Sequence, residues 1–221
     1  MTSLTSMSEE TDTAGAPVHF ATERADIITK GERTRQRLLE LAVDRFGAQG
    51  YRQTSVSEIA RAAGLTQATV YAYFENKQAL FVAALDADAS ALVLEAGGRA
   101  EGTPITQLPL AFLVELFEGV HDHPLSRRVL AGQETETHAF PELIDLPAVR
   151  LATNEIVERL RDAQRRGEVR PDLDPEQIGA GMEAIILSIL VATVQLGELG
   201  TERRQRGIVA AFAAMLDPIE R

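Results

Sequence analysis

Apolar residues recur at intervals of three and four along most of this 221-residue chain, which is the spacing that gathers side chains on one face of an α-helix. No segment convincingly shows the alternation of apolar and polar residues that a half-buried strand requires. The pattern therefore predicts an all-α fold of about nine helices, with a loop at residues 138–143. The helices are expected over residues 29–51, 56–63, 67–74, 77–97, 105–121, 124–132, 146–166, 175–196 and 201–216.

The stretch from Thr54 to Lys77 contains two short helical patterns separated by a glycine. The first pattern has one apolar face, made by Val56, Ile59, Ala60 and Ala63. Gly64 then supplies the positive φ that a sharp exit from a helix needs, Leu65 is expected to be buried, and Thr66 is suited to capping the second helix. A short helix, a glycine turn and a second short helix form the helix-turn-helix plan, whose second helix lies in the major groove of DNA.

The residue types of this stretch also match a known family. The matching positions are Ile59, Ala60, Ala63, Gly64, Thr69, Tyr71, Tyr73, Phe74 and Lys77. Together they resemble the DNA-binding signature of the TetR/AcrR family of repressors. The sequence departs from that signature at Ala68, where many members carry Gly, and at Leu65, where Val or Ile is common. Both departures are mild, since Ala is the better helix former inside a helix.

The resemblance implies two domains. Residues 25–75 are the expected helix-turn-helix DNA-binding domain of three helices, and residues 76–221 the expected helical domain for effector binding and dimerisation. Residues 1–24 have no hydrophobic periodicity and are predicted to be a disordered tail. In the family, the last two helices of each subunit pair in a homodimer interface. The dimer reads a pseudo-palindromic operator in double-stranded DNA, and a small-molecule effector in the body changes the spacing of the two reading heads.

A set of helix-turn-helix residues is predicted to contact DNA: Thr54, Ser55, Ser57, Thr66, Gln67, Ala68, Thr69, Tyr71, Tyr73 and Lys77. Gln67 is the best candidate for reading a base edge, because its amide makes two hydrogen bonds with adenine. Thr54 is expected to cap the first motif helix and, with the hydroxyls of Ser55 and Ser57, to suit a phosphate. For Tyr71, packing inside the small domain is an equally weighted alternative.

The net charge of −11 is unusual for a protein that binds DNA, but the charge is unevenly distributed. Residues 21–85 carry nine Lys or Arg against seven Asp or Glu, whereas residues 86–221 carry thirteen against twenty-three. The mildly basic segment coincides with the helix-turn-helix and permits phosphate contacts. A group of bases at the start of the first predicted helix is either a solvated face or a further set of phosphate contacts: Lys30, Arg33, Arg35 and Arg37.

Candidates for an effector pocket in the body are Phe112, Glu115, Leu116, Met182 and Ile186. Ordinary core packing is the alternative for each of them. Glu115, Glu118 and Glu183 would suit a cationic effector if the fold buries them together. The helix that contains Glu183 is apolar nearly all round, but only eleven residues separate Glu183 from Gln195, short of the roughly 20 that a membrane span needs. Burial by its own body and by a second subunit is expected instead.

No motif for catalysis stands out: the chain shows no Gly-rich phosphate loop, Ser nucleophile elbow or zinc-protease helix, and it contains no Cys. His121 and His123 are two positions apart at a helix end, so a solvated loop is favoured over a metal site. We therefore expect no enzyme activity, no cofactor and no bound metal. Without a secretory signal, a cytoplasmic location is expected. The alternative function is a protein-interaction role for the acidic body, with the DNA-binding domain as an inherited scaffold.

Overall fold

The computed structural model describes residues 29–134, 146–197 and 201–216. Within these residues the chain forms nine α-helices, one short 3₁₀ helix and no strand, which confirms the predicted all-α fold. The predicted tail and the predicted loop at residues 138–143 lie outside the described residues. The helices are α1 (Lys30–Gln53), α2 (Val56–Ala62), α3 (Gln67–Tyr73), α4 (Lys77–Arg99), α5 (Leu108–Gly119), η1 (Val120–Asp122), α6 (Pro124–Leu130), α8 (Pro147–Arg166), α9 (Pro175–Leu196) and α10 (Glu202–Leu216).

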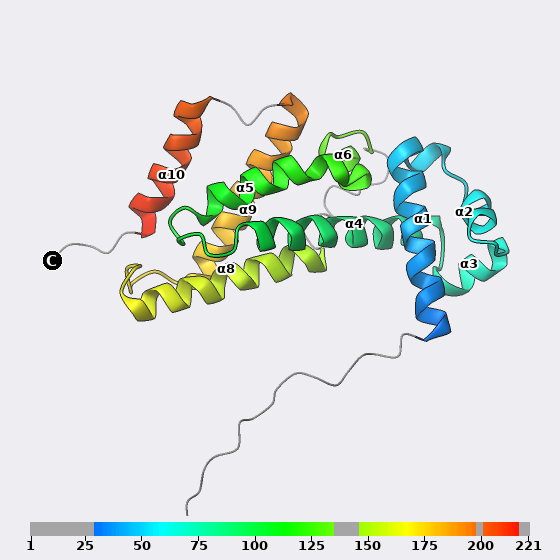
Figure 1. The fold of residues 1–221 in the computed structure, drawn as a ribbon, viewed down its shortest axis with the longest axis horizontal. Helices are drawn as coiled ribbons and strands as arrows, with labels where there is room; N and C mark the ends of the chain where they lie inside the picture. The colour runs from blue at the N-terminus through cyan, green and yellow to red at the C-terminus, as the bar shows by residue number, and fades with distance from the viewer. Residues whose placement is uncertain (1–28, 135–145, 198–200, 217–221) are drawn as a thin grey trace, which may run out of the picture.

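Helices α1, α2 and α3 form a small head at one end of the molecule (Figure 1). Its core contains the fully buried side chains of Leu38, Phe46, Ile59 and Val70. Helix α1 runs past its predicted end, but Gly50 interrupts it with a non-helical backbone (φ 79°, ψ 170°), so the predicted stop is a kink. The head is therefore a three-helix unit in which the two short helices pack against the long first one.

Helix α4 connects the head to the body. It packs against α1 at the head and against α5 and α8 in the body (Figure 1). Helix α9 packs against α8, α5 and α6, and α10 contacts α5. Helix α6 also packs against α1, so it lies between the body and the head.

The junction between α1 and α6 is closely packed. A Cβ atom added to Gly47 would lie 2.8 Å from Cβ of Pro124, so only glycine allows α6 to approach α1 at this point. The carboxylate of Glu134 is paired with Arg128 at 2.5 Å and accepts a hydrogen bond from the backbone nitrogen of Tyr51 at 3.1 Å. Close contact and the hydrogen bond from Tyr51 to Glu134 thus hold the head against the body.

Helix α9 is long and apolar enough to cross a membrane by length and composition, with a mean hydropathy of 1.8 over its most apolar window. In the structure one side of it, including Met182 and Ile186, is buried in the body. On the other side Ile185 is 44% exposed and Leu196 71% exposed. The prediction of burial on several sides is therefore confirmed for the inner face, whereas the outer face has no cover from the described part of the chain.

Candidate DNA-binding surface and effector pocket

The first turn of α3 presents short polar side chains at the surface of the head. The hydroxyl of Thr66 accepts a hydrogen bond from the backbone nitrogen of Thr69 at 3.2 Å, which is the predicted N-cap. Gln67 and Ala68 are exposed. The amide nitrogen of Gln67 donates to the hydroxyl of Tyr71, one turn later, at 3.3 Å. An amide and a phenol therefore lie side by side on the outer face of α3.

Tyr71 is 42% exposed, so it belongs to this surface and not to the core. Val70 and Phe74 instead fill the inner side of α3 and its end. Tyr73 is half-buried, and its hydroxyl would lie 3.9 Å from a Cβ atom added to Gly31 at the start of α1. The end of α3 and the first turn of α1 are thus neighbours on one side of the head.

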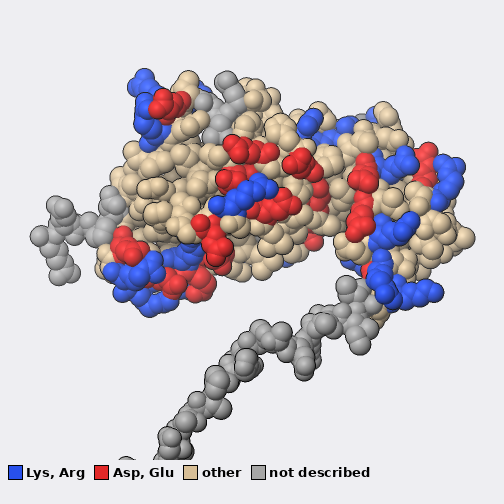
Figure 2. Space-filling view, in the orientation of Figure 1, with Lys and Arg blue, Asp and Glu red and all other residues tan. Residues whose placement is uncertain are grey.

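The bases at the start of α1 are exposed and lie close to α3. The guanidinium of Arg35 is 5.3 Å from the ring centroid of Phe74. A capping box stabilises this helix end, since Thr29 and Glu32 exchange backbone-to-side-chain hydrogen bonds at 2.7 and 3.1 Å. These bonds lower the pKa of the Glu32 carboxyl. In Figure 2, Lys and Arg side chains are spread over the head, whereas Asp and Glu side chains gather over the middle of the body.

The start of α2 contributes two more hydroxyls. Ser55, and not the predicted Thr54, caps α2, because its hydroxyl accepts a hydrogen bond from the backbone nitrogen of Ser57 at 3.2 Å. The hydroxyl groups of Ser55 and Ser57 are 2.6 Å apart, and Ser57 is exposed. These two groups lie at the N-terminus of a helix, where backbone N–H groups favour an anion.

Two predicted DNA-binding residues lie away from this cluster. Thr54 is 2% exposed and its hydroxyl contacts the carbonyl oxygens of Gly50 at 2.8 Å and Arg45 at 3.2 Å, so the side chain secures the end of α1. The ammonium group of Lys77 lies 4.3 Å from the ring centroid of Tyr51. Desolvation lowers the pKa of Lys77. Both side chains are thus part of the packing around the end of α1.

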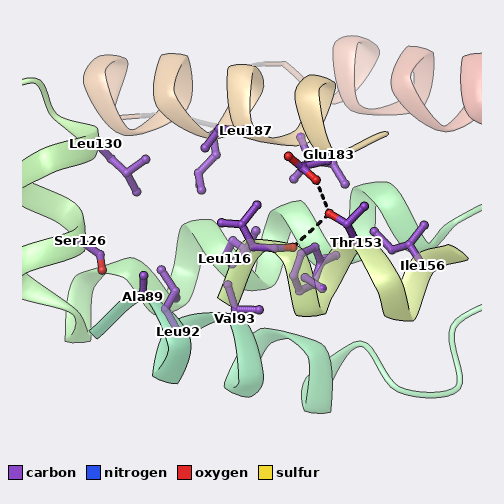
Figure 3. Close-up of a pocket in the computed structure, with 15 residues that line it drawn as sticks. Ala89, Leu92, Val93, Leu116, Ser126, Leu130, Thr153, Ile156, Glu183 and Leu187 are labelled. Atoms are coloured by element: carbon purple, nitrogen blue, oxygen red, sulfur yellow. Dashed lines mark hydrogen bonds between the residues drawn. The ribbon is translucent and has the colours of Figure 1, made fainter. Parts of the chain in front are cut away.

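A cavity of about 80 Å³ lies inside the body, with lining residues from α4, α5, α6, α8 and α9 (Figure 3). Of the predicted pocket residues, Phe112, Leu116 and Ile186 line it. Met182 and Glu115 do not: Met182 is core, and Glu115 lies 3.6 Å from Arg99 outside the lining. Residues of one helical stripe thus face different neighbours, as Met182 and Ile186 of α9 do.

A larger hollow of about 450 Å³ adjoins this cavity. Both share the side chains of Val93, Phe112, Ala152 and Ile156 as walls. The lining of the hollow also includes Leu94 and Leu151, which are 69% and 63% exposed, so it reaches the surface between α4 and α8. The shared side chains are thus the boundary between the inner cavity and a hollow that is open to the surface.

The polar residues of the inner cavity are Ser126, Thr153 and Glu183. The fold does not bury Glu115, Glu118 and Glu183 together, since Glu118 is exposed and Glu115 lies outside the cavity. Thr153 interrupts the apolar stripe of α8, a signal that sequence reasoning overlooked. Ser126 gave no comparable signal, because the inward face of the short helix α6 is set by packing alone.

His123 is buried and not part of a solvated loop, as the histidine pair was expected to be. Its Nδ1 atom lies 3.2 Å from Oδ1 of Asp88, and Oδ2 of Asp88 accepts a hydrogen bond from the backbone nitrogen of Ser126 at 2.7 Å. Asp88 on α4 therefore holds the start of α6. His121 is exposed and stacks edge-on against Phe117. Among the described residues no three His, Asp or Glu side chains are grouped as metal ligands would be.

Comparison with known proteins points to one group of relatives. Residues 38–84 match the family model described as bacterial regulatory proteins, tetR family. The HTH-type transcriptional regulator YdgC of Bacillus subtilis is 28% identical over 170 residues, which is 72% of this chain and 80% of the relative. The HTH-type transcriptional regulator AcrR of Shigella flexneri is 42% identical over 52 residues, 24% of each chain.

Solved structures share the fold over most of the chain. The fatty acid degradation regulator FadR of Bacillus halodurans superimposes with a TM-score of 0.59 at 18% identity, over 81% of this chain and 94% of that one. At this identity the likeness shows the fold alone. The matched segment of the family model, by contrast, contains α2 and α3 entire, and so includes the polar face of α3 and the hydroxyls at the start of α2.

Proposed function

The chain belongs to the TetR family of bacterial transcriptional regulators, and on that premise we propose that it is a cytoplasmic, homodimeric repressor that a small-molecule effector releases from DNA. The observation that supports this most is the outer face of α3. It presents an exposed glutamine bonded to an exposed tyrosine, on a head that also carries the exposed bases of α1.

In the proposed complex α3 lies in the major groove. The amide of Gln67 reads a base edge, and Ala68 and Thr69 offer methyl groups to a thymine. Ser55, Ser57, Tyr71 and Tyr73 bond phosphates, a role that fixes position and carries no sequence information. Thr66 contributes as the cap that holds the first turn of α3 in place. Thr54 and Lys77 maintain the shape of the head, because their polar groups already have partners within it.

The proposed dimer forms through the outer faces of α9 and α10. Ile185 and Leu196 are exposed on α9, and the exposed residues of α10 include several alanines that permit close helix approach: Ala210, Ala211 and Ala214. Burying such apolar surface favours association. An Ile185→Asp variant should therefore be monomeric in analytical ultracentrifugation, while Leu94→Asp, an exposed apolar position on α4, should remain dimeric. A dimeric Ile185→Asp protein would contradict this interface.

The proposed effector binds in the body cavity and acts through α6. This helix contributes Ser126 and Leu130 to the cavity and packs against α1 of the head. An effector that binds better when α6 is displaced shifts the population of dimers away from the head spacing that fits the operator. Its differential affinity for the two arrangements sets the size of the shift.

The decisive experiment is binding of the purified protein to its own upstream DNA across a salt series, beside a Gln67→Ala, Tyr71→Ala double variant. We expect specific binding that weakens steeply with salt, because neutralised phosphates release counterions. The double variant should lose specificity. Gln107→Ala, an exposed glutamine just before α5, is the matched control and should bind like the wild type.

Failure on the upstream DNA would be followed by selection from a random DNA pool. A protein that selects no sequence from that pool is not a repressor. That outcome would instead favour a protein-interaction role for the acidic body.

A further inference from the structure

Polar side chains interrupt the apolar lining of the body cavity at its two opposite ends. Figure 3 shows Ser126, on α6, at one end and the carboxylate of Glu183, on α9, at the other. Leu92, Leu116 and Leu187 are among the apolar side chains between them. A ligand that fits this lining has polar atoms at both ends and an apolar middle.

The hydroxyl of Ser126 has no hydrogen-bond partner among the described residues, although the side chain is only 1% exposed. Buried hydroxyls are normally paired, because leaving one unpaired costs the free energy of removing it from water. The backbone nitrogen of the same residue is bonded to Asp88, so the side chain is held against the cavity. Its missing partner is therefore best supplied by an occupant of the cavity.

The carboxylate of Glu183 is bonded to the hydroxyl of Thr153 (Figure 3). That hydroxyl also lies 3.0 Å from the carbonyl oxygen of Val149, and a single hydroxyl proton cannot satisfy both acceptors fully. No Lys or Arg side chain lines the described cavity. A carboxylate in apolar surroundings without a cationic partner favours a ligand that brings a positive charge.

The outer hollow, like the inner cavity, carries more acidic than basic side chains. Its walls carry the carboxylates of Glu101 and Glu155 and one base, Arg159. The guanidinium of Arg159 donates to the carbonyl oxygen of Thr103, which fixes it to the loop before α5. A cation that enters from the surface thus meets acidic groups in the hollow and again at Glu183. Because the inner cavity is only about 80 Å³, a longer ligand extends past Phe112 and Ile156 into the hollow.

We propose that the effector is a small organic cation with a protonated amine at Glu183, an apolar chain along the cavity and a hydrogen-bonding oxygen at Ser126. The proposal rests on the function proposed above, in which this cavity is the effector site. Such a ligand connects α9 to α6 directly. At its other end the ligand hydrogen-bonds Ser126, whose backbone nitrogen is bonded to Asp88. Ser126 lies at the start of α6, the helix that packs against the head.

The first test compares hexylammonium, hexan-1-ol and hexanoate, which share one apolar chain and differ in charge. Isothermal titration calorimetry on the full chain should show tightest binding for the cation, by about 10-fold or more over the alcohol, as expected for a hydrogen bond to a charged group. Glu183→Gln preserves the shape and the bond to Thr153 but should abolish this preference. Glu118→Gln removes the same charge from an exposed position on α5 and should retain it.

The second test addresses the other end of the cavity. A series of amino alcohols of increasing chain length is compared with the matching alkylammonium ions, in the wild type and in Ser126→Ala. One chain length should bind several-fold better as the amino alcohol, because its hydroxyl pairs with Ser126, and Ser126→Ala should remove that gain. Thermal unfolding of each variant shows whether it is folded.

The proposal is overturned if the wild type binds the alcohol or hexanoate as well as the cation, if Glu183→Gln keeps the preference, or if no cationic probe binds at millimolar concentration. Operator binding in the absence of any ligand tests the repressor role by itself. If the protein binds its operator but shows no preference for cations, only the proposed ligand class is refuted. If the protein prefers cations but selects no DNA sequence, only the proposed repressor role is refuted.

Discussion

The head and the body start their helices in different ways. Side chains cap every helix of the head and also the connecting helix α4, at Thr29, Ser55, Thr66 and Asn76. In the body α5, α6 and α8 have no side-chain cap, and each carries Pro in its first turn. Among the described helices only α9 has both, with Asp174 as its cap and Pro175 next to it.

The difference reflects where each region obtains its stability. Helices α2 and α3 are seven residues long, well below the length at which an isolated helix is stable, so local hydrogen bonds at their ends matter. Helix α6 of the body is also seven residues long and has no side-chain cap, so burial of its apolar face holds it in place, as it does for the longer body helices. This packing leaves room for a cavity and for the unpaired hydroxyl of Ser126. A precisely shaped head suits the reading of DNA, and a loosely filled body suits a response to a ligand.

The largest loss of stability is expected from a substitution at Gly50, where the head and the body meet. Its backbone angles are accessible essentially only to glycine, and an added Cβ would lie 2.6 Å from Oε1 of Glu134 and 2.7 Å from Nη2 of Arg128. Gly50→Ala should therefore lower the free energy of unfolding by about 3 to 5 kcal/mol, from backbone strain and overpacking together. Urea unfolding followed by circular dichroism measures this change.

The matched control is Gly64→Ala in the turn of the head. Gly64 also has a positive φ (70°), but an added Cβ meets nothing within 4 Å. This variant should lose about 1 to 2 kcal/mol, the cost of the left-handed backbone alone. Equal losses for the two variants would show that the junction is not closely packed.

Removing the carboxylate at the junction should have the next largest effect. Glu134→Ala leaves the backbone N–H of Tyr51 without its acceptor and Arg128 without its ion pair, so we expect a loss of about 2 to 3 kcal/mol in urea unfolding. Glu118→Ala, the same change at an exposed position of α5, should be neutral. If the junction transmits the effector signal, Glu134→Ala should also weaken the effect of a ligand on operator binding without altering ligand affinity.

The head is the region that the sequence predicts best, because its rules are local. The turn at Gly64 and the cap at Thr66 both follow from residue type and spacing, and the structure confirms both of them. The error at the start of α2 is a shift of one residue, from Thr54 to Ser55, since either hydroxyl suits a cap. The contact of Lys77 with Tyr51 has no such local signal, because it joins two helices that sequence spacing does not relate.

In the body the sequence predicts which helices exist but not which side chains surround the cavity. Met182 and Ile186 are one turn apart on the same stripe of α9, yet only Ile186 lines the cavity. The choice depends on which helices lie opposite, and that follows from the packing of the whole body. The link from Asp88 to His123 and Ser126 spans more than thirty positions and has no local signature.

A smaller loss of stability should distinguish a helix that begins with a side-chain cap from one that begins without a cap. Thr66→Ala removes the cap of α3 and should cost about 1 kcal/mol in urea unfolding, with weaker operator binding as the first turn of α3 frays. Gln107→Ala, at the uncapped start of α5, should change stability by no more than about 0.5 kcal/mol. A loss at Gln107 as large as that at Thr66 would refute the contrast between head and body.

The smallest change in stability is expected at Gly97 in α4, and it is a gain where the preceding variants lose stability. This glycine is helical and exposed, with nothing within 4 Å of an added Cβ, so Gly97→Ala should raise the free energy of unfolding by about 0.5 kcal/mol. Gly181 on the outer face of α9 has equally open surroundings in one subunit. If that face forms the dimer, the effect of Gly181→Ala on unfolding should vary with protein concentration, whereas that of Gly97→Ala should not. Concentration-independent gains at both positions would mean that the outer face of α9 stays uncovered in solution.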